Sequence, residues 1–109
     1  MEIKQKKIEA QGIRFFIILD GEEVASAYLY LLKNNHHKRP FGLIEYVIIS
    51  EKLRGQGIGT RVVKEMIETA KKENCYKLIL TSRHSKPKVH ELYEKLGFED
   101  WGKEFRMNF

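Results

Sequence analysis

The sequence predicts an α/β fold (α+β layered), in which a central mixed and twisted sheet is flanked by helices. Three observations support this fold class. The first half of the chain is rich in β-branched and aromatic runs, a helical period begins after Gly59, and another short apolar run follows that helix. A strand, a helix and a further strand in this order form a β-α-β unit, whose two strands lie parallel in one sheet.

The predicted strands of the first half are separated by turn and loop compositions. Residues 15–19 are aromatic and β-branched, and the Asp-Gly pair that follows them predicts a hairpin into a second strand at 24–32. The polar residues 33–40 predict a loop, and residues 42–50 form the next strand. We also expect a short strand within residues 3–10.

The second half alternates helices and strands. Apolar residues at helical spacing predict a helix over 60–74, with Thr60 as its candidate N-terminal cap. Residues 76–82 form a second apolar strand, and a short helix follows that Gly97 ends. Polar and apolar residues alternate over 103–109, which predicts a final strand.

Composition and length indicate one domain over residues 1–109. Hydrophobic residues make up 42% and charged residues 32% of the chain, which is too apolar for a disordered protein. The single cysteine, Cys75, cannot form an internal disulfide. No signal-peptide pattern or membrane-spanning run is present, so we expect a cytoplasmic protein without a membrane partner.

The net charge of +5 leaves several interpretations open. A positive field can attract an anionic cofactor or nucleic acid, or it can simply belong to a solvated lysine-rich surface. The predicted strands show no interleaving of aromatic and basic residues typical of an RNA-binding sheet. Nucleic-acid binding is therefore the last-ranked of these readings.

The most informative segment is a glycine-rich loop between a predicted strand and a predicted helix. Backbone N–H groups in such a loop, together with the helix N-terminus, form a cradle for phosphate or pyrophosphate. The alternative is a turn that only joins the two elements. A Walker-type loop requires a lysine directly after its last glycine, whereas Gly59 is followed by Thr60. A dinucleotide fingerprint requires G-x-G-x-x-G spacing, which the glycines of this segment do not have. The segment reads Arg54-Gly55-Gln56-Gly57-Ile58-Gly59-Thr60.

The pattern Arg54-x-x-Gly57-x-Gly59 resembles the acyl-CoA motif of the GNAT superfamily of N-acyltransferases. Residues 43–50 and 74–80 are similar to the strands on either side of that motif, and the run from Leu92 through Tyr93 to Phe98 resembles a later family motif. The resemblance covers residues 42–109 well. Before that it extends only to the strand pattern, so the chain looks like a small, N-terminally short member.

This resemblance implies an N-acetyltransferase with acetyl-CoA as co-substrate and no metal. The two parallel strands, 45–50 and 76–82, would begin together and then splay, with the pantetheine arm lying between them. The reaction would be direct attack of an amine on the thioester. The cofactor-binding residues implied are Val47, Ile48, Ile49, Arg54, Gly55, Gln56, Gly57, Ile58, Gly59, Thr60, Ser85, Lys86 and Tyr93.

Two residues are the catalytic candidates that the resemblance implies. Tyr93 matches the family tyrosine that protonates the leaving thiolate, and a phenol stays protonated at neutral pH. Its alternative role is core packing. Glu45 is the candidate general base for the acceptor amine, and its alternative is a solvated strand position.

The chain departs from the family pattern at two places. Lys86 and Val89 stand where many relatives carry asparagine and alanine, so Ser85 or the backbone would have to replace the asparagine's contact with pantetheine. The N-terminal part is also too short for the helices that commonly wall the acceptor site. The resemblance to glucosamine-phosphate N-acetyltransferases in Ile44-Glu45 and residues 74–77 therefore does not extend to the sugar.

The acceptor and the partners stay open at this level. An open acceptor site would admit a small-molecule amine or a protein or peptide amine. The exposed edge predicted at 103–109 also offers a surface for a homodimer. A non-catalytic acyl-CoA-binding regulatory module on the same fold is the alternative function, since it would need the loop at 54–60 but neither Tyr93 nor Glu45.

Overall fold

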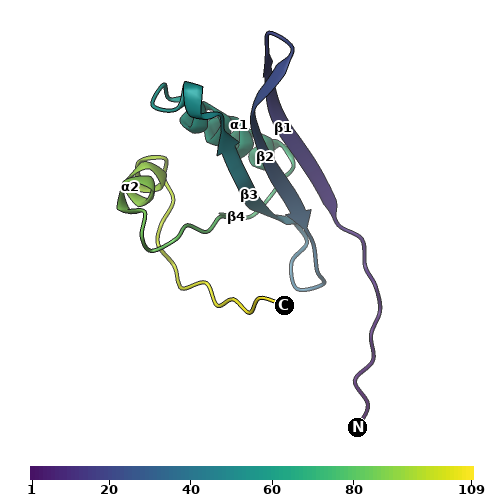
Figure 1. The fold of residues 1–109 in the computed structure, drawn as a ribbon. Coiled ribbons are helices and arrows are strands. Elements are labelled where there is room, and N and C mark those ends of the chain that lie inside the picture. Colours follow the sequence, from purple (N-terminus) through teal and green to yellow (C-terminus); the bar gives the residue numbers. More distant parts are fainter.

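The computed structural model describes all 109 residues, and Figure 1 shows their arrangement. A hairpin leads into a third strand, a helix, a short fourth strand and a second helix. None of the helices is both long and apolar enough to span a membrane. The elements are β1 (Gln11–Leu19), β2 (Glu22–Leu32), β3 (Phe41–Ile49), the 3₁₀ turn η1 (Glu51–Leu53), α1 (Ile58–Lys72), β4 (Leu78–Ile79) and α2 (Pro87–Lys95).

The strands form one four-stranded sheet in the order β1-β2-β3-β4. β1, β2 and β3 pair antiparallel in sequence order, and β4 pairs parallel to β3. The predicted mixed sheet and its β-α-β unit are therefore confirmed. The hairpin between β1 and β2 turns at Asp20 and Gly21, which both have positive φ angles of 51° and 76°. This conformation suits an Asp-Gly pair.

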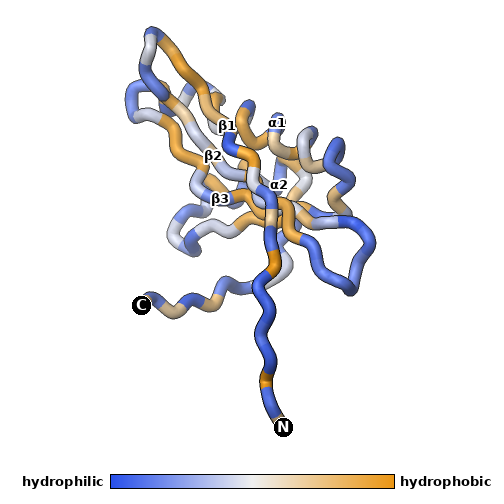
Figure 2. The backbone as a smooth tube through the Cα atoms, turned by 90° about the vertical axis from the view of Figure 1, so that its right-hand side faces the viewer, coloured by the Kyte–Doolittle hydropathy of each residue, from blue (hydrophilic) through white to orange (hydrophobic).

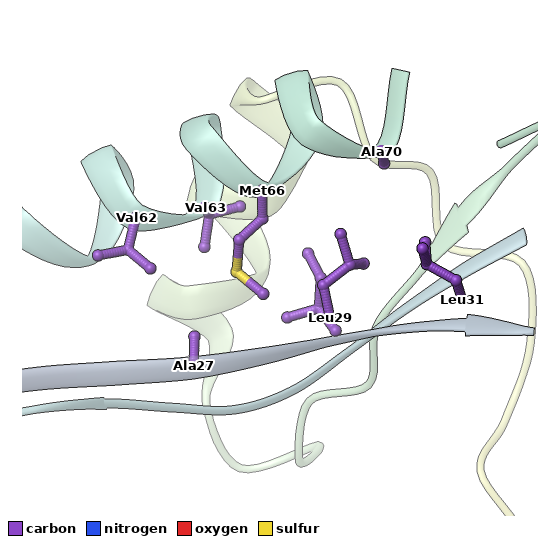
Figure 3. Packing of buried hydrophobic residues seen from close by; sticks show 8 residues of the cluster. Ala27, Leu29, Leu31, Val62, Val63, Met66 and Ala70 are labelled. Atoms are coloured by element: carbon purple, nitrogen blue, oxygen red, sulfur yellow. The ribbon is translucent and has the colours of Figure 1, made fainter. Parts of the chain in front are cut away.

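The core lies between α1 and one face of the sheet (Figure 3). Met66 on α1 is fully buried and faces β2, where Ala27 and Leu29 are also fully buried. Alternate residues of β2 point to this face, as the period of a strand requires. Side chains of α2 and the chain just beyond it, including Tyr93 and Phe98, pack against the same cluster. Its eight buried members are Ala27, Leu29, Leu31, Ile44, Val62, Val63, Met66 and Ala70.

The opposite face of the sheet carries aromatic and aliphatic side chains in contact with solvent. Phe16 on β1 and Tyr30 on β2 are exposed there. Arg14 lies among them, and its guanidinium binds both carboxylate oxygens of Glu23 at 2.6 and 2.7 Å. Tyr28 stacks on Tyr30 with ring centroids 6.2 Å apart. This open face is continuous with the strand that carries Glu45.

α1 begins two residues earlier than predicted. Its N-cap is Gly57, with a left-handed φ of 77° and no side-chain hydrogen bond, and its first residue is Ile58. The prediction that Thr60 caps the helix is therefore wrong, because Thr60 already lies inside the first turn. The helix ends at Lys72, and Asn74 follows with a positive φ of 62°. Asparagine tolerates this conformation, so it marks the end of the helix.

The second helix matches its prediction closely. Pro87 is its first residue, where a missing N–H is harmless. Lys95 is its last, and Gly97 follows with φ of 105°. A glycine reaches this left-handed region without strain, so the helix ends there.

Three strand predictions need correction. The strand expected at 76–82 shortens to the two residues of β4. Residues 3–10 and 103–109 belong to no strand, and the side chain of Phe105 is 90% exposed. Alternation makes a segment able to form a strand, but the strand exists only where an edge accepts its hydrogen bonds. A β4 of two residues offers the tail only a very short edge.

Candidate functional site

The glycine-rich loop leaves the end of β3 through η1 and enters α1. Gly55 and Gly57 both have left-handed φ angles, 80° and 77°. A Cβ atom built on either glycine would meet no atom within 4 Å. Glycine is therefore required at these positions by the backbone conformation and not by lack of space.

The N-terminus of α1 has free backbone donors. No side chain caps the helix, and the N–H of Arg61 is the first that bonds back, to the carbonyl of Gly57 at 3.1 Å. The preceding N–H groups, of Ile58, Gly59 and Thr60, have no intrahelical acceptor. With the positive end of the helix dipole, these donors can bind an anion.

Side chains of the loop brace it against β3. Arg54 Nε donates a hydrogen bond of 3.3 Å to the carbonyl of Ile49, and its guanidinium lies 3.8 Å from the Glu51 carboxylate. Gln56 Nε2 donates to the carbonyl of Lys52 at 3.4 Å. Both side chains are exposed, so Arg54 can also turn toward an anion held by the loop.

β3 and β4 diverge immediately after they pair. Gly42 pairs with Leu78 and Leu43 with Ile79, and no later residue of β3 pairs with β4. β3 nevertheless continues to Ile49 with β2 on its other side. The expected splay of the two parallel strands is therefore confirmed. It leaves the β4-side edge of β3 without a strand neighbour over residues 44–49.

A β-bulge interrupts β3 at the middle of this open edge. Glu45 pairs with Tyr28 and Ile48 pairs with Ser26, so two residues of β3 face one residue of β2. The first of the two is Tyr46, with a positive φ of 51° and a side chain 71% exposed. A bulge bends its strand and redirects the backbone groups beside it. Sequence reasoning missed this feature, since tyrosine gives no signal for positive φ.

The side chains that follow Tyr46 on β3 point in different directions. Val47 packs against the core cluster, and Ile49 lies near Gly59, whose Cβ would meet it at 3.7 Å. Ile48 is exposed on the opposite face. These three residues can therefore offer a ligand on the open edge only their backbone groups.

Glu45 projects to the open face of the sheet. Its neighbour Ile44 is buried in the core, and successive side chains of a strand point to opposite faces. Glu45 is half-exposed and forms no ion pair, and its cross-strand partner is Tyr28. An unpaired carboxylate beside aromatic rings can attract a cationic amine.

Tyr93 lies on α2, on a different element from Glu45. Its ring packs against the core cluster and contacts the Phe98 ring edge-on, with centroids 5.9 Å apart. Partial burial raises the pKa of the Tyr93 phenol above its ordinary value of 10.0. A phenol in this setting remains a proton donor at neutral pH.

Ser85 and Lys86 form the turn before α2. Lys86 is the N-cap of the helix without a side-chain hydrogen bond, and both residues are exposed. His90 shares a hydrogen bond of 2.8 Å between its Nε2 and the carbonyl of Arg83, which fixes this turn on the helix. Three or more His, Cys, Asp or Glu side chains gather nowhere in an arrangement that could hold a metal ion.

The match to a known family agrees with this geometry. Residues 2–98 match the acetyltransferase (GNAT) family. The chain belongs to the GNAT family. In this GNAT protein, the glycine-rich loop, the diverging parallel strands and α2 all fall inside the matched region.

Three relatives show how far the similarity extends. A glucosamine 6-phosphate N-acetyltransferase of Trypanosoma brucei brucei is 34% identical over 81% of this chain and 58% of its own length. An N-alpha-acetyltransferase 30 of Xenopus laevis is 33% identical over 76% of this chain and 30% of its own. The solved structure of a putative acetyltransferase from Agrobacterium tumefaciens is 36% identical. Its TM-score is 0.81, over 90% of this GNAT chain and 69% of that one.

The GNAT chain is short beside its relatives. Its match spans less than three fifths of the length of these two curated proteins. The acceptor named for each relative belongs to that relative.

Proposed function

We propose that this protein transfers the acetyl group of acetyl-CoA to a primary amine. One observation carries the proposal: the cradle of free N–H groups at Gly57 and α1 directly follows the strand whose β4-side edge is open. A pyrophosphate and an extended amide-bearing arm need these two features side by side. Membership in the GNAT family supports the assignment.

The loop would hold the pyrophosphate. The N–H groups of Ile58, Gly59 and Thr60 donate to its oxygens, and the helix dipole adds a favourable field. Arg54 exchanges its contact with the Ile49 carbonyl for a charge-assisted hydrogen bond to phosphate.

The open edge of β3 would bind the pantetheine arm. Amide groups of the arm can pair with backbone groups near Val47 and Ile49, as an added strand would. The bulge at Tyr46 changes the direction of the edge at the point where the arm ends. Ser85 and Lys86, in the turn before α2, would contact the arm from the opposite side.

The chemistry would use Glu45 and Tyr93. The amine nitrogen attacks the thioester carbon, and the tetrahedral intermediate collapses with cleavage of the carbon–sulfur bond. Glu45 accepts the proton that the amine loses, directly or through a water molecule. Tyr93 donates its phenolic proton to the thiolate, so the products are the N-acetyl amine and free coenzyme A.

The acceptor would approach Glu45 from the open face of the sheet. Tyr28 and Tyr30 form an exposed aromatic surface there, and the nearby cation Arg14 is already paired with Glu23. We expect an amine on a large or extended acceptor, such as a peptide, to have access to this surface. Relatives named for glucosamine 6-phosphate make the amino sugar phosphate the comparison substrate.

Calorimetric titration with acetyl-CoA tests the cradle, with adenosine triphosphate as a parallel ligand. Gly57→Glu should abolish binding of acetyl-CoA, because a carboxylate would occupy the pyrophosphate position. Gly57→Ala is the matched control, since it shares the backbone strain of about 1–2 kcal/mol without the charge. Equal affinity in the two variants would remove the loop from the site. The absence of acetyl-CoA binding in the wild type would end the proposal.

Thiol release with a panel of amines tests the chemistry. Tyr93→Phe should lower turnover far more than it changes acetyl-CoA affinity. Glu45→Gln should slow transfer chiefly at lower pH, where the amine arrives protonated. Acetyl-CoA binding without turnover on any amine would instead support the regulatory acyl-CoA-binding module.

A further inference from the structure

β1 is the outer strand of the sheet, and its free edge has little of the usual protection against pairing with another molecule. Only β2 lies beside it. Its nine residues, Gln11–Leu19, include no lysine and no proline. The bulge in the hairpin comes from the extra residue Val24 in β2, so β1 itself stays regular. Proteins usually protect an edge by short length, charged side chains, proline or a bulge, and the one charged side chain on this edge is Arg14, which is paired with Glu23 of β2.

A groove lies between β1 and α1 on the core face of the sheet. Phe15 and Ile17 on β1 and Val62 on α1 direct apolar side chains toward it, and its volume is about 520 Å³. α1 packs mainly over β2 and β3, so this side of the core face is only partly covered. Figure 2 looks toward this side, with the apolar β1 in front and α1 beside it. A strand added beside β1 would direct alternate side chains into the groove.

The side of α1 that lines the groove carries positive side chains at one end and negative side chains at the other. Arg61 and Lys64 come first along the helix, and Glu65 and Glu68 follow. All four side chains are exposed, and only Glu68 forms an ion pair, with Lys71 at 3.2 Å. Two positive charges are therefore followed by two negative charges on one stripe of the helix.

We propose that two copies of this chain pair through their β1 edges, antiparallel and about a two-fold axis. Such an axis reverses α1, so that Arg61 and Lys64 of one copy face Glu65 and Glu68 of the other. The charge order is then complementary to itself, which is what an isologous interface requires. The two sheets would join into one continuous sheet, with Phe15 and Ile17 of both β1 strands in the shared groove.

A single two-fold axis can relate both the two β1 edges and the two sets of charged residues on α1. The groove brings residues 15–17 of β1 next to residues 61–68 of α1, and the midpoint of the charged set falls between Lys64 and Glu65. An axis through Phe16 passes near that level. Neighbouring strands lie about 4.8 Å apart, so long arginine, lysine and glutamate side chains can approach each other across the two β1 strands. The interface does not depend on acetyl transfer.

Sedimentation equilibrium of the full chain tests the pairing. The wild type should have twice the chain mass of 12.9 kDa. The double variants Arg61→Glu/Lys64→Glu and Glu65→Lys/Glu68→Lys should each dissociate about tenfold more readily or worse, since like charges then face each other. An equimolar mixture of the two should recover the dimer, as a heterodimer.

The control keeps the charge change and moves it away from the groove. Lys72→Glu/Lys88→Glu alters exposed lysines outside the groove and should leave the dimer unchanged. A monomeric wild type overturns the proposal. So do charge variants that dimerise like the wild type, or a mixture that stays monomeric.

A second pair of variants tests the strand itself. Phe16→Lys places a charge at the middle of the β1 edge, on a side chain that is 56% exposed and lies outside the core cluster. It should give a monomer with an unchanged circular dichroism spectrum. Phe105→Lys is the matched change on the exposed tail and should remain a dimer. The reverse result would place the interface on the tail and refute the pairing through β1.

Discussion

Met66→Ala tests the packing on which the whole site depends. Met66 is fully buried between α1 and β2, and it is one of only 11 buried residues among the 109. The substitution removes three side-chain atoms from a closed core, which typically lowers the free energy of unfolding by about 2–5 kcal/mol. A domain of this size has a total stability of about 5–15 kcal/mol. The loss is therefore a large fraction of the total.

Urea unfolding followed by circular dichroism measures this loss. The midpoint for Met66→Ala should fall by about 1 M or more, given the urea dependence of small domains. Met107→Ala makes the same chemical change on the tail, where the side chain is 76% exposed, and should alter stability by less than about 0.5 kcal/mol. Equal losses in the two variants would show that the tail is packed. A loss below about 1 kcal/mol for Met66→Ala would refute the packing of α1 on the sheet.

Two further predictions concern the close contact between β3 and β4 at Gly42 and the change of stability at alkaline pH. A Cβ atom on Gly42 would lie 2.8 Å from the Leu78 side chain, so Gly42→Ala should lower the free energy of unfolding in urea by about 1–3 kcal/mol. At Gly12 the Cβ atom would instead lie 3.2 Å from the exposed Tyr30 ring, which can move, so Gly12→Ala should lower it by less than about 0.5 kcal/mol. Equal losses of stability in the two variants would exclude steric crowding between Gly42 and Leu78. Burial raises the pKa of Tyr93 in the folded protein above its value in the unfolded chain. The neutral phenol therefore contributes stability below the unfolded pKa, and this contribution declines above about pH 10, where the unfolded chain loses the proton first. Tyr93→Phe should reduce the decrease in the free energy of unfolding at alkaline pH, and parallel curves for the two proteins would contradict this.

The elements that sequence analysis located correctly are those with local causes. The charged and apolar periods of α1 follow from helix geometry alone, and Met66 falls on the predicted inner face. Gly97 has the positive φ angle expected of a glycine that ends a helix. The divergence of β3 from β4 was expected only from the family resemblance, because no local pattern encodes where two strands separate.

The misplaced elements depend on partners far along the chain. The tail at 103–109 alternates as a strand should, yet an alternating segment becomes a strand only beside a matching edge. The bulge at Tyr46 was equally invisible, because its residue types suit regular strand. Ala27 faces two residues of β3 there, and that mismatch of register is a property of the pair of strands. Sequence analysis left open whether Glu45 is a catalytic base or a solvated strand position, and its face of the sheet and its lack of an ion pair required the structure.

The candidate site forms where regular pairing stops. Gly42 permits close contact between β3 and β4, because Leu78 and Leu29 occupy the space that a side chain would need. One residue further along β3 the parallel ladder ends, and the backbone of β3 becomes free to bind a ligand. The strand remains in place because β2 and the core under α1 hold its other side. The same helix then presents its uncapped N-terminus at the end of that strand, so the fold that buries Met66 also aligns the two parts of the proposed acetyl-CoA site.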